Sequence, residues 1–178
     1  VIREQSERLM EFTESYRRLS YMPEPKKKRF SLTDSLHNLG LLLQSDFENA
    51  HIHFILRSTP SDIYIEGDEK QLSQVFLNLL KNSMQSLEGK TDGQIEVTLE
   101  VTDKLYIKLL DNGQGIPMEL QEKIFVPFFT TKTEGTGIGL SLCRQIIKRH
   151  GGNLYLQESG QGRTLFVIEW PIVPFIPK

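Results

Sequence analysis

The chain has 178 residues, of which 38% are hydrophobic and 25% are charged, a composition typical of a folded protein of one domain with an appendage. Its net charge of -2 argues against nucleic acid as a partner. The single cysteine, Cys143, excludes an internal disulfide and a cysteine-cluster metal site. No run approaches the roughly 20 apolar residues of a membrane span, and no signal-peptide pattern is present. We expect a cytoplasmic fragment of a longer protein, and a membrane anchor outside this region is compatible with that expectation.

The N-terminal segment, residues 1–22, is predicted to be helical, because it contains neither proline nor glycine. Two prolines, Pro23 and Pro25, then end the helix, and residues 23–30 are predicted to be a linker with a solvated basic run. Two interpretations remain open for the helix: a seam that pairs two chains through residues 1–21, or an amphipathic helix that lies on its own domain. Both depend on apolar residues at heptad-like spacing, namely Ile2, Leu9, Phe12, Tyr16 and Leu19.

A second domain is predicted over residues 31–173, followed by a short tail at residues 174–178. Strands outnumber helices, and short turns join most neighbours, which predicts an α+β fold with two layers: a mixed, mostly antiparallel sheet covered on one face by helices. The first helix is capped by Ser31 or Thr33. This helix is predicted to end near residue 48, and two further helices are predicted over residues 68–87 and 137–150. The predicted strands cover residues 51–57, 62–66, 94–102, 105–110, 153–158 and 163–170.

The predicted helix 68–87 has a polar stripe beside its apolar face. At 100° per residue, Asn78, Asn82 and Gln85 fall together, with Asn82 at the border of the apolar stripe. Asn82 is open to two interpretations. It is either a structural amide with a satisfied hydrogen bond or a ligand for Mg²⁺, which binds hard oxygen donors and keeps several waters.

Two glycine-rich segments adjoin apolar runs. The first, DNGQGIP over residues 111–117, begins like an ordinary turn, but the Asp111 carboxylate at a strand end could also accept a hydrogen bond from the amine of adenine. The second, GTGIGL over residues 135–140, precedes a helix, and free N–H groups at a helix start favour phosphate. Neither a dinucleotide fingerprint nor a P-loop fits, because the required glycines are replaced by Leu140 and Met84. Lys132, just before this loop, is a candidate point charge for phosphate.

In their order and spacing, these segments resemble the ATP-binding catalytic domain of bacterial sensor histidine kinases. NLLKNSMQSL is similar to the N box, DNGQGIP to the first glycine box, IFVPFFTTK to the F box and GTGIGL to the second glycine box. The resemblance covers residues 30–171 and is strongest to the nitrogen-regulation branch of these kinases. It implies the Bergerat fold shared with gyrase-type ATPases and heat-shock chaperones.

The resemblance also implies that the cofactors are ATP and Mg²⁺. Asn82 would be the metal ligand, and Asn78, on the same helix, would assist it in binding Mg²⁺. Asp111 would bind the adenine amine, Gly113 and Gly115 would shape the base pocket, and Thr164 would lie near the base. Many members of the family carry a lysine where this chain has Gln85, so one phosphate contact differs. The remaining residues expected to line the nucleotide site are Ile116, Thr131, Lys132, Gly135, Thr136, Gly137, Ile138, Gly139 and Leu140.

The phosphate acceptor of this family is a histidine on a stem helix, in a motif that none of the four histidines of this chain shares; we interpret His37, His51, His53 and His150 as structural. We therefore expect transfer of the γ-phosphoryl group to a histidine on a segment of the dimerisation stem that is absent from this chain, with no catalytic base assigned here. The resemblance implies that residues 1–22 are the C-terminal part of that stem helix. A response regulator receiver domain is the expected downstream partner. The alternatives are a nonenzymatic nucleotide-binding or dimerisation module and a serine-directed kinase of the same fold.

Overall fold

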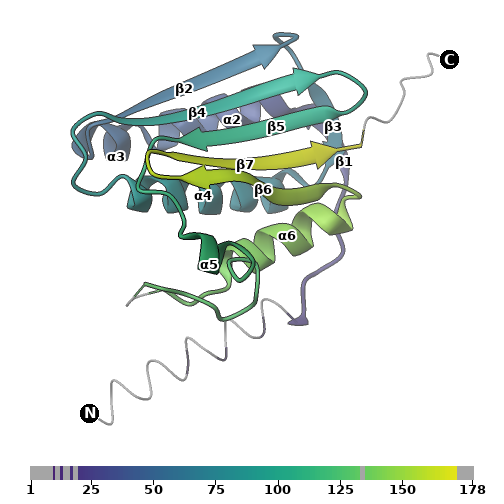
Figure 1. The fold of residues 1–178 in the computed structure, drawn as a ribbon. Coiled ribbons are helices and arrows are strands. Elements are labelled where there is room, and N and C mark those ends of the chain that lie inside the picture. Colours follow the sequence, from purple (N-terminus) through teal and green to yellow (C-terminus); the bar gives the residue numbers. More distant parts are fainter. Residues whose placement is uncertain (1–9, 11–12, 14–16, 18–19, 133–134, 172–178) are drawn as a thin grey trace, which may run out of the picture.

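The computed structural model describes residues 10, 13, 17, 20–132 and 135–171 (Figure 1). The five apolar positions of the predicted N-terminal helix and the tail at residues 174–178 lie outside the described residues. The pairing of two chains through residues 1–21 therefore stays a prediction.

The centre of the domain is a five-stranded sheet with the strand order β2-β4-β5-β7-β6. Only β2 and β4 run parallel, and the other neighbours are antiparallel. The predicted hairpin around residues 103–104 is confirmed as the β4–β5 connection. The strands are β2 (Ile52–Thr59), β4 (Gly93–Val101), β5 (Leu105–Asp111), β6 (Asn153–Gly160) and β7 (Arg163–Trp170).

Helices cover one face of this sheet, as expected for an α+β fold (Figure 1). Alternate residues of β4, such as Ile95, Val97 and Leu99, are buried against the apolar stripe of α4 and α6. Cys143 is fully buried in this core, where desolvation raises the pKa of its thiol to about 12, as expected of a packed, unreactive cysteine. The helices are α2 (Leu32–Leu42), α3 (Gln44–Asn49), α4 (Glu69–Ser86), α5 (Met118–Gln121) and α6 (Gly139–Arg149).

The helix predicted to run from residue 31 or 33 to residue 48 is in fact two helices that break at Leu43. The apolar spacing continues across the break, because Leu39, Leu43 and Phe47 are all buried. The Phe47 ring stacks on Phe54 of β2, with centroids 5.1 Å apart. This tertiary contact holds α3 against the sheet edge, and nothing in the local pattern predicts it.

Part of the predicted linker is also ordered against the domain. Residues Lys28–Ser31 form strand β1, which pairs antiparallel with β3 (Tyr64–Gly67). Before the strand, the Arg149 guanidinium donates to the carbonyl of Met22 over 2.7 Å. The predicted linker is therefore wrong for residues 28–30, where the strand pairing provides backbone partners that no local pattern reveals. The basic side chains of residues 26–29 are exposed, as expected of a solvated run.

Asp68 connects this segment to the start of α4. Its carboxylate caps the helix by accepting from the N–H groups of Lys70 and Gln71, and it also accepts from Lys26 N–H at 2.8 Å. Burial alone would raise the pKa of Asp68, but these three donors outweigh it and hold the pKa below its ordinary value. The buried His150 supports the same turn, because its Nε2 accepts the Asp68 N–H at 3.0 Å.

Replacing Asp68 with alanine should lower the free energy of unfolding by about 1 kcal/mol at pH 7, because a helix cap is lost. The pKa is lower in the folded than in the unfolded chain, so this stabilisation is present above the unfolded value and is lost as the pH falls through the folded value. Urea unfolding at pH 7 and pH 3 measures both effects, with the exposed Asp62→Ala as control. An equal loss at both pH values would contradict the electrostatic explanation.

Candidate functional site

The candidate site begins with Asp111, the last residue of β5, which is 2% exposed and faces the helices. One carboxylate oxygen accepts from the Ser83 hydroxyl at 2.8 Å, and the other accepts from the Ser86 hydroxyl and the Gly113 N–H, both at 2.9 Å. A carboxylate has about four acceptor positions, so Asp111 can accept one further donor. Burial raises its pKa, although these three hydrogen bonds oppose the shift.

The two serines that hold Asp111 were not among the predicted site residues. Ser83 falls on the apolar stripe of α4, four residues after Leu79 and four before Leu87, and it is 2% exposed. A polar residue in such a stripe needs a hydrogen-bond partner. The position of Ser83 in the sequence therefore indicated that its hydroxyl is hydrogen-bonded inside the domain. The partner itself, 28 residues further along the chain, depends on the packing of α4 under β5.

The 112–117 loop is fixed tightly beside Asp111. Gly115 adopts a φ of +79°, and a Cβ there would lie 2.0 Å from the carbonyl oxygen of Gly160. The Ile116 N–H donates to the Ser159 hydroxyl at 2.8 Å, and that hydroxyl lies 3.4 Å from the Thr164 hydroxyl. Thr164 is buried and pairs with Asp111 across β7 and β5. The structure thus brings together all the residues predicted for the base pocket, which also include Gly113.

The second glycine segment leads into α6, whose first residue is Gly139. Ile138 caps the helix without a side-chain hydrogen bond, and the first N–H groups of a helix have no partner within it. Open space surrounds the position of a Cβ on Gly139, in contrast to Gly137, where a Cβ would lie 2.5 Å from the backbone of Phe128. Gly137 therefore shapes the loop, while the helix start at Gly139 and Leu140 is accessible to an anion.

The polar side of α4 meets Lys132, which comes from the loop before the glycine segment. The Lys132 amine donates to Asn82 Oδ1 at 3.0 Å and to Gln85 Oε1. Desolvation lowers the pKa of Lys132, while Glu88 acts in the opposite direction. Asn78, by contrast, lies beside the Cys143 thiol. One stretch of α4, residues 82–86, thus contacts both Lys132 and the base-pocket carboxylate. Thr131 and Thr136 are both exposed near this loop.

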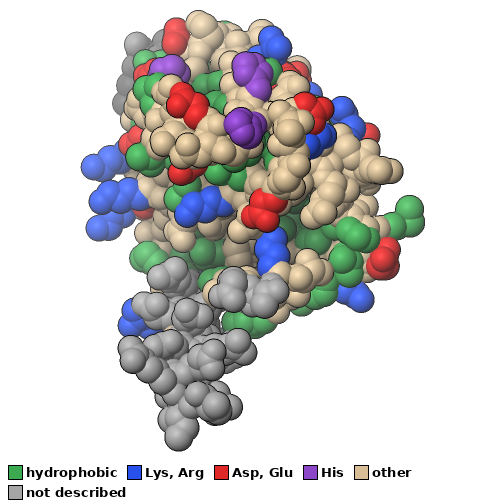
Figure 2. Space-filling model, turned by 90° about the vertical axis from the view of Figure 1, so that its left-hand side faces the viewer, with side chains coloured by type: hydrophobic (Ala, Val, Ile, Leu, Met, Phe, Trp, Pro, Cys, Tyr) green, Lys and Arg blue, Asp and Glu red, His purple; other side chains and the backbone are tan. Residues whose placement is uncertain are grey.

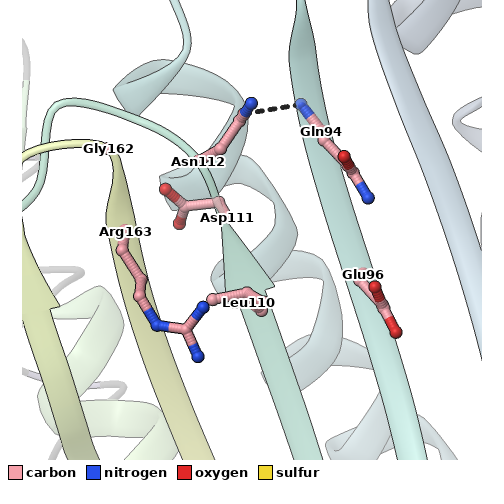
Figure 3. A pocket seen from close by; sticks show the side chains of 7 residues that line it. All are labelled: Gln94, Glu96, Leu110, Asp111, Asn112, Gly162 and Arg163. Carbon is pink, nitrogen blue, oxygen red and sulfur yellow. Dashed lines mark hydrogen bonds between the residues drawn. The ribbon is translucent and has the colours of Figure 1, made fainter.

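A small hollow lies at the same end of the sheet, and its lining includes Asp111 and Asn112 (Figure 3). It is lined by residues of β4, the end of β5 and the start of β7, including Glu96, Leu110 and Arg163. Successive residues of a strand point to opposite faces, so Leu110 faces this hollow while the adjacent Asp111 faces the helices. Glu96 already pairs with Arg57 at 2.9 Å.

Asp111 and Thr164 lie at the left-hand end of the sheet in Figure 1, where β5 ends and β7 begins. Figure 2 views this end directly and shows charged side chains of both signs near its middle and hydrophobic side chains toward its lower right. The exposed hydrophobic residues include three that lie from the start of α5 to the glycine segment, Met118, Val126 and Phe128.

Comparisons with known proteins give the family of this chain. Residues 67–174 match the family described as histidine kinase-, DNA gyrase B-, and HSP90-like ATPase. The sensory histidine kinase/phosphatase NtrB of Rhodobacter capsulatus is 30% identical over 98% of this chain and 52% of its own length. The nucleotide-free catalytic domain of histidine kinase ThkA is 34% identical, with a TM-score of 0.74 over 82% of this chain and 95% of that domain. ThkA in complex with the response regulator TrrA is 28% identical, with a TM-score of 0.78 over 99% of this chain and 51% of that chain.

The chain therefore belongs to the family of histidine kinase-, DNA gyrase B- and HSP90-like ATPases, and it is a catalytic domain of the histidine kinase type. The expected two-layer fold and the expected kinship with nitrogen-regulation kinases are confirmed. The chain spans 24% to 52% of the length of the first curated relatives it matches. In the part of the chain that the structure describes, no helix has the length and apolar character needed to cross a membrane.

Proposed function

We propose that this domain binds Mg-ATP with the adenine against Asp111 and the triphosphate at the start of α6. The observation that carries the proposal is the buried Asp111 carboxylate, which three donors fix in place and which keeps capacity for a fourth. The exocyclic amine of adenine is a donor of the required kind. Backbone N–H groups at Gly139 and Leu140 would bind phosphate oxygens.

Asn82 is the proposed ligand of Mg²⁺. Its amide oxygen already lies 3.0 Å from the Lys132 amine, so this oxygen is oriented toward a positive charge, as a metal ligand must be. When bound, Mg²⁺ would neutralise charge on the phosphate groups. The protein supplies the orientation of the nucleotide, through Asp111 and the glycine segment, and this positioning is the main contribution to phosphoryl transfer.

We further propose that the γ-phosphoryl group goes to a histidine on a dimerisation stem outside this chain, and then to a response regulator in the cytoplasm. The relatives support the stem and the regulator, because NtrB is named a histidine kinase and ThkA was crystallised with the regulator TrrA. Within this chain, His150 is buried and engaged by Asp68 N–H and the carbonyl of Ile146. It is therefore a structural histidine, as predicted.

The test is transfer of labelled γ-phosphate from Mg-ATP, by this chain in trans, to a purified stem segment that carries the parent protein's histidine. We expect an acid-labile, base-stable label on the stem, and none on a stem with histidine replaced by glutamine. An acid-stable label would indicate a serine-directed kinase. Tight ATP binding without any label, even when stem and domain are covalently joined, would indicate a nonenzymatic signalling module.

A further inference from the structure

Lys132 has surroundings that the proposed function does not explain. Its amine donates to two neutral amide oxygens, Asn82 Oδ1 at 3.0 Å and Gln85 Oε1, which lie one turn apart on α4. Neither acceptor neutralises the positive charge of the amine. The side chain is therefore a held cation with remaining capacity to bind an anion.

The backbone of Lys132 is fixed to the same loop that leads to the start of α6. Its N–H donates to the Thr130 hydroxyl at 3.0 Å, and its carbonyl accepts from Gly135 N–H at 3.3 Å. At the base of the loop, Phe128 N–H donates to the Gly137 carbonyl at 2.9 Å. The amine is thus connected to the glycine segment through the backbone and to α4 through its side chain.

This position lies between the two ends of the proposed nucleotide site. Two residues of α4, Asn82 and Gln85, hold the amine. Each is followed directly by a serine, Ser83 or Ser86, that holds Asp111. A nucleotide with its base at Asp111 and its outer phosphates at the glycine segment would bring those phosphates to the loop that carries Lys132. A monophosphate would end before it.

We propose that Lys132 determines the preference of this site for a triphosphate over a monophosphate, and that Gln85 is the positioning residue that holds the amine ready. This inference rests on the proposed function, because it takes the adenine to lie at Asp111. Gln85 becomes more important when a divalent ion binds Asn82 Oδ1, since that oxygen can no longer accept from the amine. The Gln85 amide then remains as the tether on α4.

Calorimetric titration of ATP and AMP in the presence of Mg²⁺ tests this assignment. Lys132→Met should weaken ATP binding by about tenfold or more, since a charge-assisted contact is lost, and should change AMP binding by less than about twofold. The matched control is Lys81→Met, which removes the same charge from an exposed position on α4. It should leave both affinities within about twofold of the unmodified protein.

Two further variants test the role of Gln85. Gln85→Leu should lower the ratio of ATP to AMP affinity by about threefold, as expected for a lost tether, without moving the urea midpoint. The double variant Gln85→Lys, Lys132→Met places an amine directly on α4. It should restore most of the ratio of ATP to AMP affinity that the unmodified protein has. Failure to recover it would overturn the role of position 85.

The outcomes separate this inference from the proposed function. If the unmodified chain binds both nucleotides but Lys132→Met binds ATP equally well, the assignment of Lys132 is wrong and the nucleotide site stands. An equal loss of ATP and AMP affinity in Lys132→Met would mean that the lysine supports the loop and makes no phosphate contact. If the unmodified chain binds neither nucleotide, the proposed function and this inference both fail.

Discussion

Replacing Asp111 with asparagine is expected to weaken ATP binding by about 100-fold, which corresponds to about 2.7 kcal/mol. The carboxylate of Asp111 accepts three hydrogen bonds from Ser83, Ser86 and Gly113 and has one acceptor position left. An amide replaces one of the two oxygens with an NH₂ group, which can only donate. Either a protein donor or the adenine amine then faces another donor inside a buried site, where an unsatisfied polar group is costly.

The fold should survive this change, because asparagine has nearly the shape of aspartate and both serine hydroxyls can also accept. The matched control is Asp103→Asn, in the exposed hairpin at the opposite end of β5. Calorimetry with ATP measures the affinity, and circular dichroism checks the fold. A folded Asp111→Asn protein that binds ATP within about threefold of the unmodified chain would refute the assignment of the base pocket.

Gly115→Ala is expected to destabilise the domain by about 3 kcal/mol and to weaken ATP binding at the same time. The backbone of Gly115 has a φ of +79°, and the added methyl group would lie 2.0 Å from the Gly160 carbonyl oxygen. Because backbone cannot rotate away as a side chain can, the 112–117 loop or the β6–β7 turn must shift. Either movement disturbs the contact between Ile116 and Ser159 beside the base pocket.

Gly162 provides a matched control for this prediction. It has the same φ of +79°, but nothing lies within 4 Å of its Cβ position. Gly162→Ala should therefore show only the cost of the left-handed backbone, about 1 kcal/mol. Urea unfolding followed by the fluorescence of the single tryptophan, the buried Trp170, measures both variants. Equal losses would show that the close approach to Gly160 has no energetic consequence.

The secondary structure that the sequence predicts well is that of strongly periodic segments. Helix α4, predicted over residues 68–87, is confirmed as Glu69–Ser86 with Asp68 as its cap, because one apolar stripe and one capping residue define it locally. The grouping of Asp111 with Gly113 and Gly115 was also accessible from the sequence, because these residues are adjacent in it; their role in a base pocket stays a prediction. Strand β1 was missed because its partner, β3, is distant in the chain. The break at Leu43 was missed because the apolar spacing continues across it.

The sequence by itself determined which residues are candidates for chemistry and what kind of chemistry each favours. Asn82, Asp111 and the glycines of residues 135–139 were identified from their types, their spacing and their resemblance to one family. Local backbone rules and side-chain donor types are properties of short segments, and a sequence can be interpreted at that range without any structure.

Only the tertiary structure decided which side chains act together. It joined Ser83 and Ser86 to Asp111 across 28 and 25 residues, and it brought Lys132 to Asn82 and Gln85 across 50 and 47 residues. The physical reason is that helix α4 packs beneath β5 through its apolar stripe, and this burial fixes the direction of every polar side chain at the border.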